Sequence, residues 1–557
     1  MKIEIRARDG LARGGTLVLD DLRLPSPAAA ETAALFPSLG LRSHENVPLA
    51  AGEAFVRAWL VPGEEPHAVH PASTEPVPTG AVLMVANWHT ALADPAAYVR
   101  FIVALKERLP LDAPWYAPAA ALPSNAALLA WTGFDLFDYT GPDLATSRSR
   151  FLMPEGGFSA DALESGVCSC PGCAAGDLGM HNRLALDREL ALVRRFVHDG
   201  RLRDLVDARC RLDANLVAVL RLLDRRYAFV ERWTPVTGPA PMRANSAEAL
   251  GRPEVRRFAE RVLERYRPAR ADTVVLLPCS ARKPYSLSRS HALFQGAVRS
   301  RAHELIVTSP LGIVPRELEL CYPAAHYDVP VTGYWDAEEV AVIAATLAAY
   351  LSRHGFSRVI AHLEGGALRV AEAAAREVGC TLEPTVVDGR PTSDASLALL
   401  DASLDGSRRQ HEDPLRGLAL YQFDCELTSA GLRSRGRYPN VQYLRGRNPV
   451  FGIDAEAGLL RPTFEGWSLL GNGYRVEIDD FVPQGDVLAP GVLDADPRIR
   501  PGDEVLVVGP SAYATGRAAM SAGEMLRSTR GVAVRRRKVM KREREIMQKN
   551  PGGSEAV

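Results

Sequence analysis

The sequence predicts a multidomain α/β protein, and three observations support this fold class. The chain has 557 residues, well beyond the size at which a single hydrophobic core stops growing. Its middle part alternates short apolar runs with helical segments, and its last part has short strands joined by glycine turns. We therefore expect an N-terminal domain of strands and helices, a central doubly wound α/β domain, a small α+β domain and a C-terminal β-barrel.

Changes in composition along the chain predict where these domains meet. A linker of mixed composition follows the helices of the N-terminal part. A polar segment, DASLDGSRRQHEDP, precedes the β-rich part. The predicted domains are the N-terminal domain (1–230), the central α/β domain (231–400), the α+β domain (401–490), the barrel (491–545) and a disordered tail (546–557).

Composition and charge argue against a membrane protein and leave nucleic acid open as a partner. No apolar run approaches the roughly 20 residues of a membrane helix, and the opening MKIEIRARDG lacks the apolar core of a signal peptide. We expect a soluble cytoplasmic protein with no membrane partner. The net charge of -1 does not favour nucleic acid, but residues 530–542 carry basic side chains and no acidic one. Either a solvated tail or a basic binding surface fits that stretch.

Apolar spacing predicts a long helix near the end of the N-terminal domain. Leu186, Leu190, Val193 and Val197 recur at intervals of four, three and four, which places them on one face of a helix that ends at Gly200. This face is expected to pack in the core.

The central domain contains three predicted strands, TVVLLP, ELIVTSP and RVIAHLE. Before the last strand, Asp336 and Glu339 predict a helix with an N-terminal capping box, and Gly355 stands where that helix should end. Each strand is followed directly by a polar or glycine-rich segment. These segments are PCSARKPY, TSPLG and HLEGGA. Because ligands of open α/β sheets bind beyond the carboxyl ends of the strands, these three loops should line one crevice.

Three cysteines and a histidine indicate a metal site in the N-terminal domain. Cys168, Cys170 and Cys173 form a C-x-C-x-x-C pattern, and His181 follows the last cysteine by eight residues. In a long cytoplasmic chain such a cluster is not a disulfide framework, whereas four ligands of this kind close a tetrahedral zinc site. We predict one structural zinc ion. Buried free thiols are the alternative, and His198 is a competing fourth ligand.

The segment PCSARKPYSLSRSH, from Pro278 to His291, concentrates reactive side chains directly after a predicted strand. It carries a thiol, an amine, a phenol, several hydroxyls and an imidazole. One interpretation is a polar turn followed by a helix cap. The other is a catalytic loop, because these groups supply the nucleophiles, acids and bases of enzymes.

Residues 1 to about 225 resemble the RNA-guanine transglycosylases. The resemblance rests on VCSCPGC with the following His181, on RDGLARGGTLVLDDLRLPSPA and on GFDLFDYTGPDLATSRSRFL. The resemblance implies a degenerate TIM-barrel-like N-terminal domain with a zinc ion held by three cysteines and a histidine. The D-S-G-G-F-Q-like and G-G-L-A-like segments of that family are missing, and too few residues remain for a complete eight-stranded barrel. Asp135 or Asp138 could be a relic of the family's nucleophile, but base exchange is not expected.

The central segment resembles the signature of the archaeosine synthases, P-C-S-x-x-K-P-Y-x-x-S-x-S-H, at every specified position. This resemblance implies an archaeal enzyme whose substrate is tRNA with 7-cyano-7-deazaguanine in the D-loop. It also implies that the amine of free lysine adds to the nitrile and that a radical S-adenosylmethionine partner enzyme cleaves the adduct. Glutamine is the alternative nitrogen donor, but no glutaminase domain is recognisable.

Addition of an amine to a nitrile needs a free nucleophile, a proton for the nitrile nitrogen and stabilised charge. Cys279 could add first and give a thioimide, with Lys283 or His291 lowering its pKa. Alternatively His291 activates the amine, and Lys283 binds the lysine carboxylate or a phosphate. These three residues are the predicted catalytic groups. The predicted substrate-binding residues are Ser280, Tyr285, Ser288, Ser290, Glu364 and Gly365, and Tyr334 and Trp335 stack on the base or lie in the core.

Residues from about 497 to 542 resemble a PUA domain, a small RNA-binding barrel. We expect its basic edge, Arg535, Arg536, Arg537 and Lys538, to contact tRNA phosphates. Two other functions stay open, a transglycosylase that exchanges the base itself and a non-catalytic tRNA-binding subunit. A homodimer is also left open.

Overall fold

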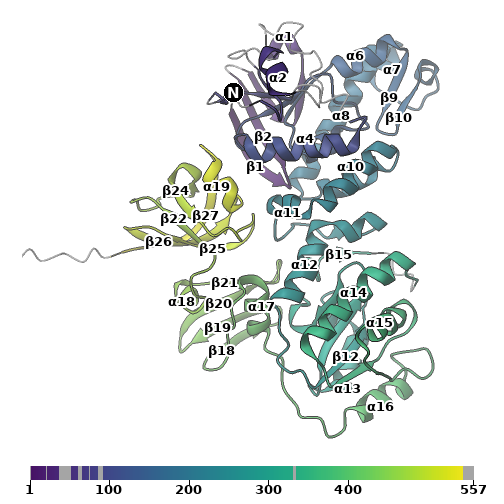
Figure 1. Cartoon of the computed structure of the whole chain (residues 1–557), viewed down its shortest axis with the longest axis vertical. Helices are drawn as coiled ribbons and strands as arrows, with labels where there is room; N and C mark the ends of the chain where they lie inside the picture. Colours follow the sequence, from purple (N-terminus) through teal and green to yellow (C-terminus); the bar gives the residue numbers. More distant parts are fainter. Residues whose placement is uncertain are drawn as a thin grey trace, which may run out of the picture.

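The computed structural model describes most of the chain and divides it into modules (Figure 1). The predicted tail, 546–557, lies outside the described residues. The described ranges are 2–19, 22–36, 52–59, 66–73, 76–78, 80–85, 92–329 and 334–542. In Figure 1 the N-terminal module lies at the top, the central α/β module at the lower right and the two C-terminal β modules at the left.

The N-terminal module combines an antiparallel sheet with a parallel one. β1 (Lys2–Asp9), β2 (Ala12–Leu19) and β3 (Leu22–Ser26) form the antiparallel sheet in the order β1-β2-β3. The other sheet has the order β4-β8-β7-β6-β5, and all its pairings are parallel. Its strands are β4 (Ala28–Ala30), β5 (His67–Val69), β6 (Leu83–Val85), β7 (Trp115–Ala117) and β8 (Leu136–Asp138). The hairpin β9 (Arg150–Met153) and β10 (Gly156–Ser159) follows.

Helices cover these sheets, and the predicted apolar helix face lies on the longest of them. The helices are α1 (Thr32–Leu35), α2 (Glu53–Trp59), α4 (Pro95–Arg108), α5 (Ala126–Trp131), α6 (Thr140–Ser147), α7 (Pro171–Ala175), α8 (Leu178–His198), α9 (Leu202–Cys210), α10 (Ala214–Arg225) and α11 (Tyr227–Val230). The four residues of that face on α8, Leu186, Leu190, Val193 and Val197, are all buried in the core of this module. As in the rest of the described chain, these helices are too short or too polar to cross a bilayer.

The central module is built on a five-stranded sheet with the order β14-β13-β12-β16-β17. Only β13 and β14 pair antiparallel. The strands are β12 (Thr273–Pro278), β13 (His303–Thr308), β14 (Gly312–Pro315), β16 (Arg358–Ala361) and β17 (Leu382–Pro384). The helices are α12 (Pro253–Glu264), α13 (Arg289–Val298), α14 (Ala337–His354), α15 (Gly365–Val378) and α16 (Asp394–Ser403), and the short strands β11 (Met242–Arg243) and β15 (Tyr327–Asp328) pair beside the sheet.

Helices pack on both faces of this sheet, as a doubly wound fold requires. Val274 and Leu276 of β12 belong to the core that includes α14 and α15, whereas Val275 and Leu277 face α13 and α16. Alternate residues of a strand point to opposite faces, so β12 is apolar throughout because both faces are covered. The predicted helix is confirmed as α14, with the capping box of Asp336 and a left-handed Gly355 at its end.

The strand order creates the expected crevice. From β12 the chain moves through α13 to β13 on one side, then returns through α14 to β16 on the other side. The two connections diverge from β12, so a space opens above the carboxyl ends of β12 and β16.

Two β modules follow the buried helix α17 (Pro414–Phe423). The first sheet is antiparallel and has the order β18 (Arg433–Arg437), β19 (Asn440–Arg445), β20 (Asn448–Asp454) and β21 (Leu459–Pro462), with α18 (Phe464–Leu469) after it. The second sheet has the order β23-β27-β26-β25-β22-β24. Its strands are β22 (Arg475–Ile478), β23 (Val487–Leu488), β24 (Val492–Ala495), β25 (Glu504–Val508), β26 (Ala512–Ala518) and β27 (Val532–Lys541). The helix α19 (Ala522–Arg527) lies between β26 and β27 in the sequence. β22 thus comes from the segment 401–490 but pairs in the last sheet. The core of both modules is continuous with that of the central sheet.

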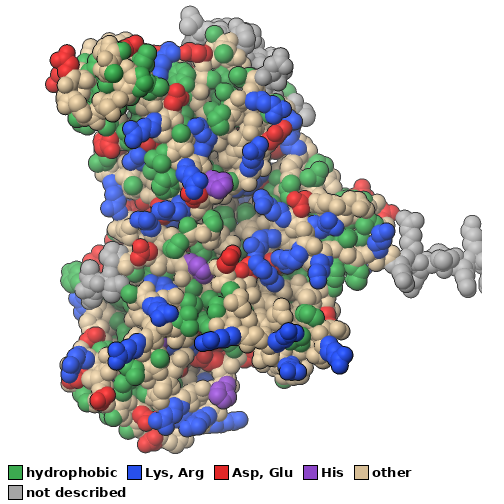
Figure 2. Space-filling model, turned by 180° about the vertical axis from the view of Figure 1, so that it is seen from behind, with side chains coloured by type: hydrophobic (Ala, Val, Ile, Leu, Met, Phe, Trp, Pro, Cys, Tyr) green, Lys and Arg blue, Asp and Glu red, His purple; other side chains and the backbone are tan. Residues whose placement is uncertain are grey.

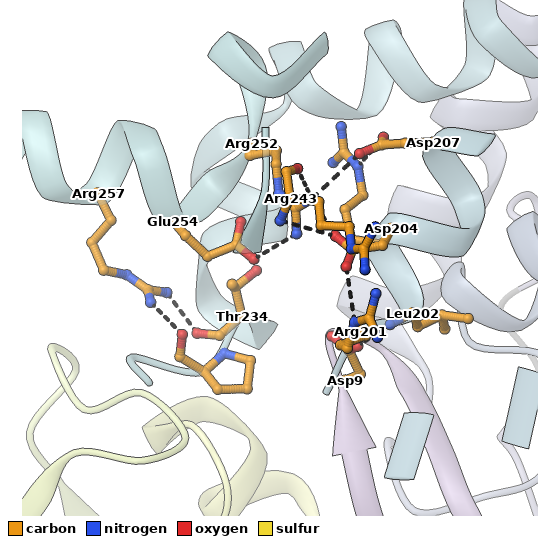
Figure 3. A network of polar contacts seen from close by, with 12 residues as sticks. Asp9, Arg201, Leu202, Asp204, Asp207, Thr234, Arg243, Arg252, Glu254 and Arg257 are labelled. Carbon is orange, nitrogen blue, oxygen red and sulfur yellow. Dashed lines mark hydrogen bonds and ion pairs between the residues drawn. The ribbon is translucent and has the colours of Figure 1, made fainter. Parts of the chain in front are cut away.

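Buried ion pairs hold the N-terminal and central modules together (Figure 3). Arg252, just before α12, contacts Asp204 of α9 at 2.9 Å and Glu254 at 3.4 Å. Asp9, at the end of β1, accepts a hydrogen bond from the backbone N–H of Leu202 at 2.5 Å. Burial, together with the negative charges of Glu254 and Asp204, raises the pKa of Asp9 to about 7.

Asp9→Asn should remove a pH-dependent cost from this joint. The native state keeps a proton on Asp9 that the unfolded chain releases above pH 4, so stability should fall as the pH rises from about 4 to 7. An asparagine oxygen can still accept from Leu202. The variant should therefore match the parent near pH 4 and exceed it by about 4 kcal/mol at pH 8, as measured by urea unfolding. A constant difference at every pH would contradict this assignment.

Candidate functional site

A cavity of about 500 Å³ lies where the three central loops were expected to converge. Its lining includes Pro278 and Cys279 after β12, Ser309 and Pro310 after β13, and Glu364 after β16. The predicted crevice is therefore confirmed, and it is placed by the strand order described above.

The lining of this cavity is acidic. Asp336, Glu339 and Glu364 belong to it, and its described lining residues include no lysine, arginine or histidine. Glu339 accepts a hydrogen bond from the Ser309 hydroxyl at 2.6 Å, which fixes the carboxylate that also completes the α14 capping box. An acidic cavity of this kind attracts cationic ligands, such as an ammonium group.

Trp335 forms one wall of the cavity against the start of α15. A methyl group placed on Gly366 would lie 2.9 Å from Cγ of the Trp335 ring, so a glycine is needed for this approach. Tyr334 also lines the cavity and is 70% exposed, and the guanidinium of Arg369 lies over its ring. An indole beside a solvent-accessible phenol offers a surface on which a flat base can stack.

Cys279 is the thiol of the cavity, and two neighbours counteract the effect of its burial. Burial raises its pKa, whereas a hydrogen bond with Thr308 and the charge of Lys283 lower it. Lys283 lies with its Nζ 3.9 Å from the centre of the Tyr327 ring. Burial lowers the pKa of this lysine, and Cys279 and Asp328 oppose that shift. The two residues therefore form an interacting thiol and amine pair at the edge of the cavity.

A chain of hydroxyl groups runs beneath this pair. The hydroxyl of Tyr285 lies 2.8 Å from that of Tyr327, which lies 2.5 Å from Oγ1 of Thr308. All three residues are buried. Because Thr308 also contacts Cys279, these three hydroxyl groups link the thiol to the interior of the loop.

Other residues of the central signature hold the loop in place. Ser288 is the N-cap of α13, its hydroxyl accepting from the backbone N–H of His291 at 3.2 Å and lying 3.2 Å from that of Ser290. The Ser280 hydroxyl donates to the carbonyl of Arg282 at 2.7 Å, which closes a turn. The interpretation as a polar turn with a helix cap thus describes this part of the segment.

His291 is fully buried below the cavity. Its Nδ1 accepts a hydrogen bond from Arg316 at 2.8 Å, and the same guanidinium binds Glu304 and Glu319. Burial and the Arg316 charge lower the pKa of His291 to about 3, so the imidazole is neutral at physiological pH. A neutral imidazole held in this way positions the loop and Arg316.

The structure brings only part of the predicted site into the cavity lining. Cys279, Glu364 and Gly365 lie there. The lining does not include Ser280, Lys283, Tyr285, Ser288, Ser290 or His291. Sequence reasoning missed Asn245 and Ser246, which reach the cavity from the linker before α12. No local pattern marked these two residues, although a capping box did mark Glu339.

The four predicted metal ligands are gathered at one point. Sγ of Cys170 and Cys173 lie 3.7 Å apart, and Nδ1 of His181 is 3.4 and 3.3 Å from them. These three atoms and Sγ of Cys168 all lie within 4.8 Å of one another. A tetrahedral ion with metal–sulfur bonds of about 2.3 Å needs sulfur atoms about 3.8 Å apart, so the donor set fits. His198 is exposed at the end of α8 and is not part of this group.

Contacts around the cluster orient its histidine. The carbonyl of Leu152 lies 2.9 Å from Nε2 of His181, which leaves Nδ1 free to bind a metal, and the ring of Phe151 stacks on the imidazole at 3.7 Å. A methyl group on Gly172 would lie 2.4 Å from the backbone nitrogen of His181, so glycine allows α7 to approach α8.

Asp135 and Asp138, the two candidates for a relic of the transglycosylase nucleophile, are buried, and both carboxylates are hydrogen-bonded. Asp135 is bound by the guanidinium of Arg13, and Asp138 accepts from the Tyr116 hydroxyl at 2.6 Å and from backbone N–H groups. Both carboxylates therefore stabilise the parallel sheet of the N-terminal module.

The basic residues of β27 do not form one free surface. Arg537 makes two hydrogen bonds to the buried Glu504, at 2.8 and 2.6 Å, and Arg536 is tied to Asp486 through its backbone. Arg535 lines a cleft near β1, whereas Arg537 and Lys538 line a groove beside the β18–β21 sheet.

Two family models match parts of this chain, and several known proteins are similar to it over most of its length. A family model of the PUA domain matches residues 474–540, and one described as "Domain of unknown function (DUF5591)" matches residues 255–404. The archaeosine synthase of Haloferax volcanii is 37% identical over 578 residues, which cover 95% of this chain and 98% of that protein. The chain belongs to the archaeosine synthase family. The archaeosine synthase subunit alpha of Methanosarcina acetivorans is 41% identical and covers 78% of this chain and 76% of that protein.

This chain is also similar to a second group of proteins, as the sequence resemblance implied. The tRNA-guanine(15) transglycosylase of Methanothermobacter thermautotrophicus is 28% identical over 469 residues, which cover 77% of this chain and 66% of that protein. The central signature thus predicted the family correctly, and the C-terminal sheet is a PUA domain.

Lys283→Met should make Cys279 less reactive. The lysine charge stabilises the thiolate, so its loss should raise the pKa of Cys279 further and leave less thiolate at pH 8. We expect alkylation by iodoacetamide, followed by mass spectrometry of the Cys279 peptide, to slow by about threefold or more. Arg282→Met removes an exposed neighbouring charge and should have little effect. Equal rates in the parent and Lys283→Met would show that the pair does not interact.

Proposed function

We propose that this enzyme of tRNA archaeosine modification adds the amine of free lysine to the nitrile of 7-cyano-7-deazaguanine in the tRNA D-loop. Its relatives are named archaeosine synthase, and the complete central signature stands at the carboxyl end of β12. The observation that carries the choice of lysine is the acidic cavity. Lysine brings two ammonium groups, whereas glutamine brings one and a neutral amide, so lysine matches three carboxylates better.

In the proposed reaction the amine lone pair attacks the nitrile carbon. A carbon–nitrogen bond forms, one π bond of the nitrile breaks, and the nitrile nitrogen takes up a proton while the attacking nitrogen loses one. The product is a substituted formamidine. Glu339 and Glu364 hold the ammonium group that does not react, and the aromatic side chains of Tyr334 and Trp335 hold the base.

Cys279 has two candidate roles in this reaction. It can add to the nitrile first, giving a thioimide from which the amine displaces the thiolate, with Lys283 stabilising that thiolate. Otherwise the amine attacks directly, and Lys283 binds the carboxylate of the lysine substrate or a tRNA phosphate. His291 acts in both cases as a positioning residue, because it is buried and neutral.

The metal cluster supports a structural zinc ion bound by Cys168, Cys170, Cys173 and His181. Three sulfur donors and one imidazole are the ligand type that zinc prefers, and they leave no open coordination position. The ion would tie α7 and the residues just before it to α8, because its ligands lie on those segments. The β9–β10 hairpin would be held indirectly, through the contact of His181 with Leu152 of β9.

The N-terminal parallel sheet supports descent from a barrel. β5, β6, β7 and β8 pair in chain order, and the first strand, β4, pairs with the last, β8. A closed barrel needs this pairing of first and last strands. The domain boundaries, a radical S-adenosylmethionine enzyme that cleaves the adduct and a homodimer stay predictions.

Full-length protein with tRNA bearing the nitrile base and free lysine should yield a nucleoside heavier by the mass of one lysine. Glu364→Gln should raise the KM for lysine about tenfold or more and leave tRNA affinity unchanged, because it removes one partner of the ammonium group. Glu372→Gln, an exposed residue of the same helix, is the matched control. Incorporation of free deazaguanine would support base exchange instead, and binding without a mass change would support a non-catalytic subunit.

Metal analysis should give about one zinc ion per chain. Cys170→Ala should lose the metal and destabilise the N-terminal module, because binding of the ligands is coupled to folding. Cys380→Ala, which changes a cysteine far from the cluster in sequence and outside it, should keep both metal and stability. Metal-free protein with unchanged unfolding would refute the zinc assignment.

A further inference from the structure

A second cavity, of about 610 Å³, lies between the β18–β21 sheet and the PUA domain and is not used by the chemistry above. One wall is a row of residues that cross all four strands. Arg435 of β18 pairs with Gln442 of β19, Gln442 with Gly452 of β20, and Gly452 with Arg461 of β21. Directly paired residues share one face of a sheet, so this row forms a continuous strip.

The opposite wall comes from β26 and β27. It consists of Thr515, Arg537 and Lys538, and Thr515 pairs with Lys538 across the two strands. The described lining contains four basic side chains and no aspartate or glutamate. Phe464, a half-buried aromatic residue, also lines the groove. In the sequence it comes after the strands of the first wall and before those of the second.

Buried carboxylates hold some of these arginines in position. Asp454, 5% exposed, binds both Arg461 and Arg517, and Glu504, 1% exposed, binds Arg537 and contacts Arg517 at 3.5 Å. Three guanidinium groups thus share two carboxylates, and one positive charge is left over.

Two further cations add to that excess. Arg435 and Lys538 make no ion pair with any described residue. In Figure 2 several Lys and Arg side chains and few acidic ones lie over the lower right lobe, which is the β18–β21 module seen from behind. The groove is therefore built to attract a ligand with several negative charges.

We propose that this groove, lined by Arg435, Arg461, Arg537 and Lys538, binds a segment of the tRNA backbone together with the PUA domain. Fixed arginines suit phosphate oxygens, and the aromatic edge of Phe464 suits a base from an unpaired segment. The RNA-binding surface then extends from β27 onto the β18–β21 sheet. This inference rests on tRNA as the substrate, but it does not depend on the nitrile chemistry.

Gly452 allows a direct test, because a side chain there would enter open space. No atom lies within 4 Å of an added Cβ, and the backbone is not in the left-handed region. Gly452→Leu should therefore fill the groove without strain. With full-length protein and a tRNA transcript, we expect this variant to weaken binding about tenfold in a fluorescence titration.

Charge reversal gives a second, independent variant. Arg435→Glu should weaken tRNA binding and lower the slope of log Kd against log salt by about 1, because a phosphate contact and its released counterion are lost. Arg447→Glu changes an exposed arginine of the same module outside the groove and is the matched control. Thermal unfolding of all three variants should match that of the parent.

Three outcomes would overturn the proposal. They are unchanged tRNA affinity in both Gly452→Leu and Arg435→Glu, equal losses in Arg447→Glu, and an equal loss of binding to polyglutamate, which would show a site for any polyanion. Lysine addition at saturating tRNA should persist in the groove variants. Failure of lysine addition in the parent protein would instead count against the proposed reaction and not against the groove.

Discussion

The position of the reactive cavity depends on one constraint, the burial of β12 on both faces. Val274 and Leu276 pack toward α14 and α15, and Val275 and Leu277 pack toward α13 and α16. A strand covered on both sides cannot be displaced without exposing apolar surface at about 25 cal/mol per Å². Since β13 and β16 pair on either side of this strand, the loops after all three strands must meet at its carboxyl end.

The central signature divides into residues that face the cavity and residues that support them. Cys279 lies in the lining, whereas Ser288 caps α13 and His291 binds Arg316 in the interior. The supporting residues fix the loop that carries the thiol. A long signature in a sequence can therefore mark one side chain in a cavity and the loop geometry that holds it there.

The modules are coupled through shared cores and buried ion pairs. The core of the central sheet continues into both C-terminal β modules, and Glu231 binds Arg257 of α12 at 2.7 Å and Arg500, before β25, at 2.6 Å. Breaking one partner of such a buried pair leaves an uncompensated charge, so these contacts favour a fixed arrangement. A fixed arrangement lets an RNA surface on one module set the distance to a cavity on another.

The sequence by itself determined the elements whose signals are local. The strand TVVLLP, the capping box of Asp336 and the spacing of Cys168, Cys170 and Cys173 each depend on neighbouring residues, and the structure contains all of them. Only the tertiary structure decided which residues from distant segments meet. Asn245 reaches the cavity from a linker, and Arg537 is bound by a buried Glu504 from another strand. Burial and long-range pairing are sums over the whole fold, so no short window of sequence contains them.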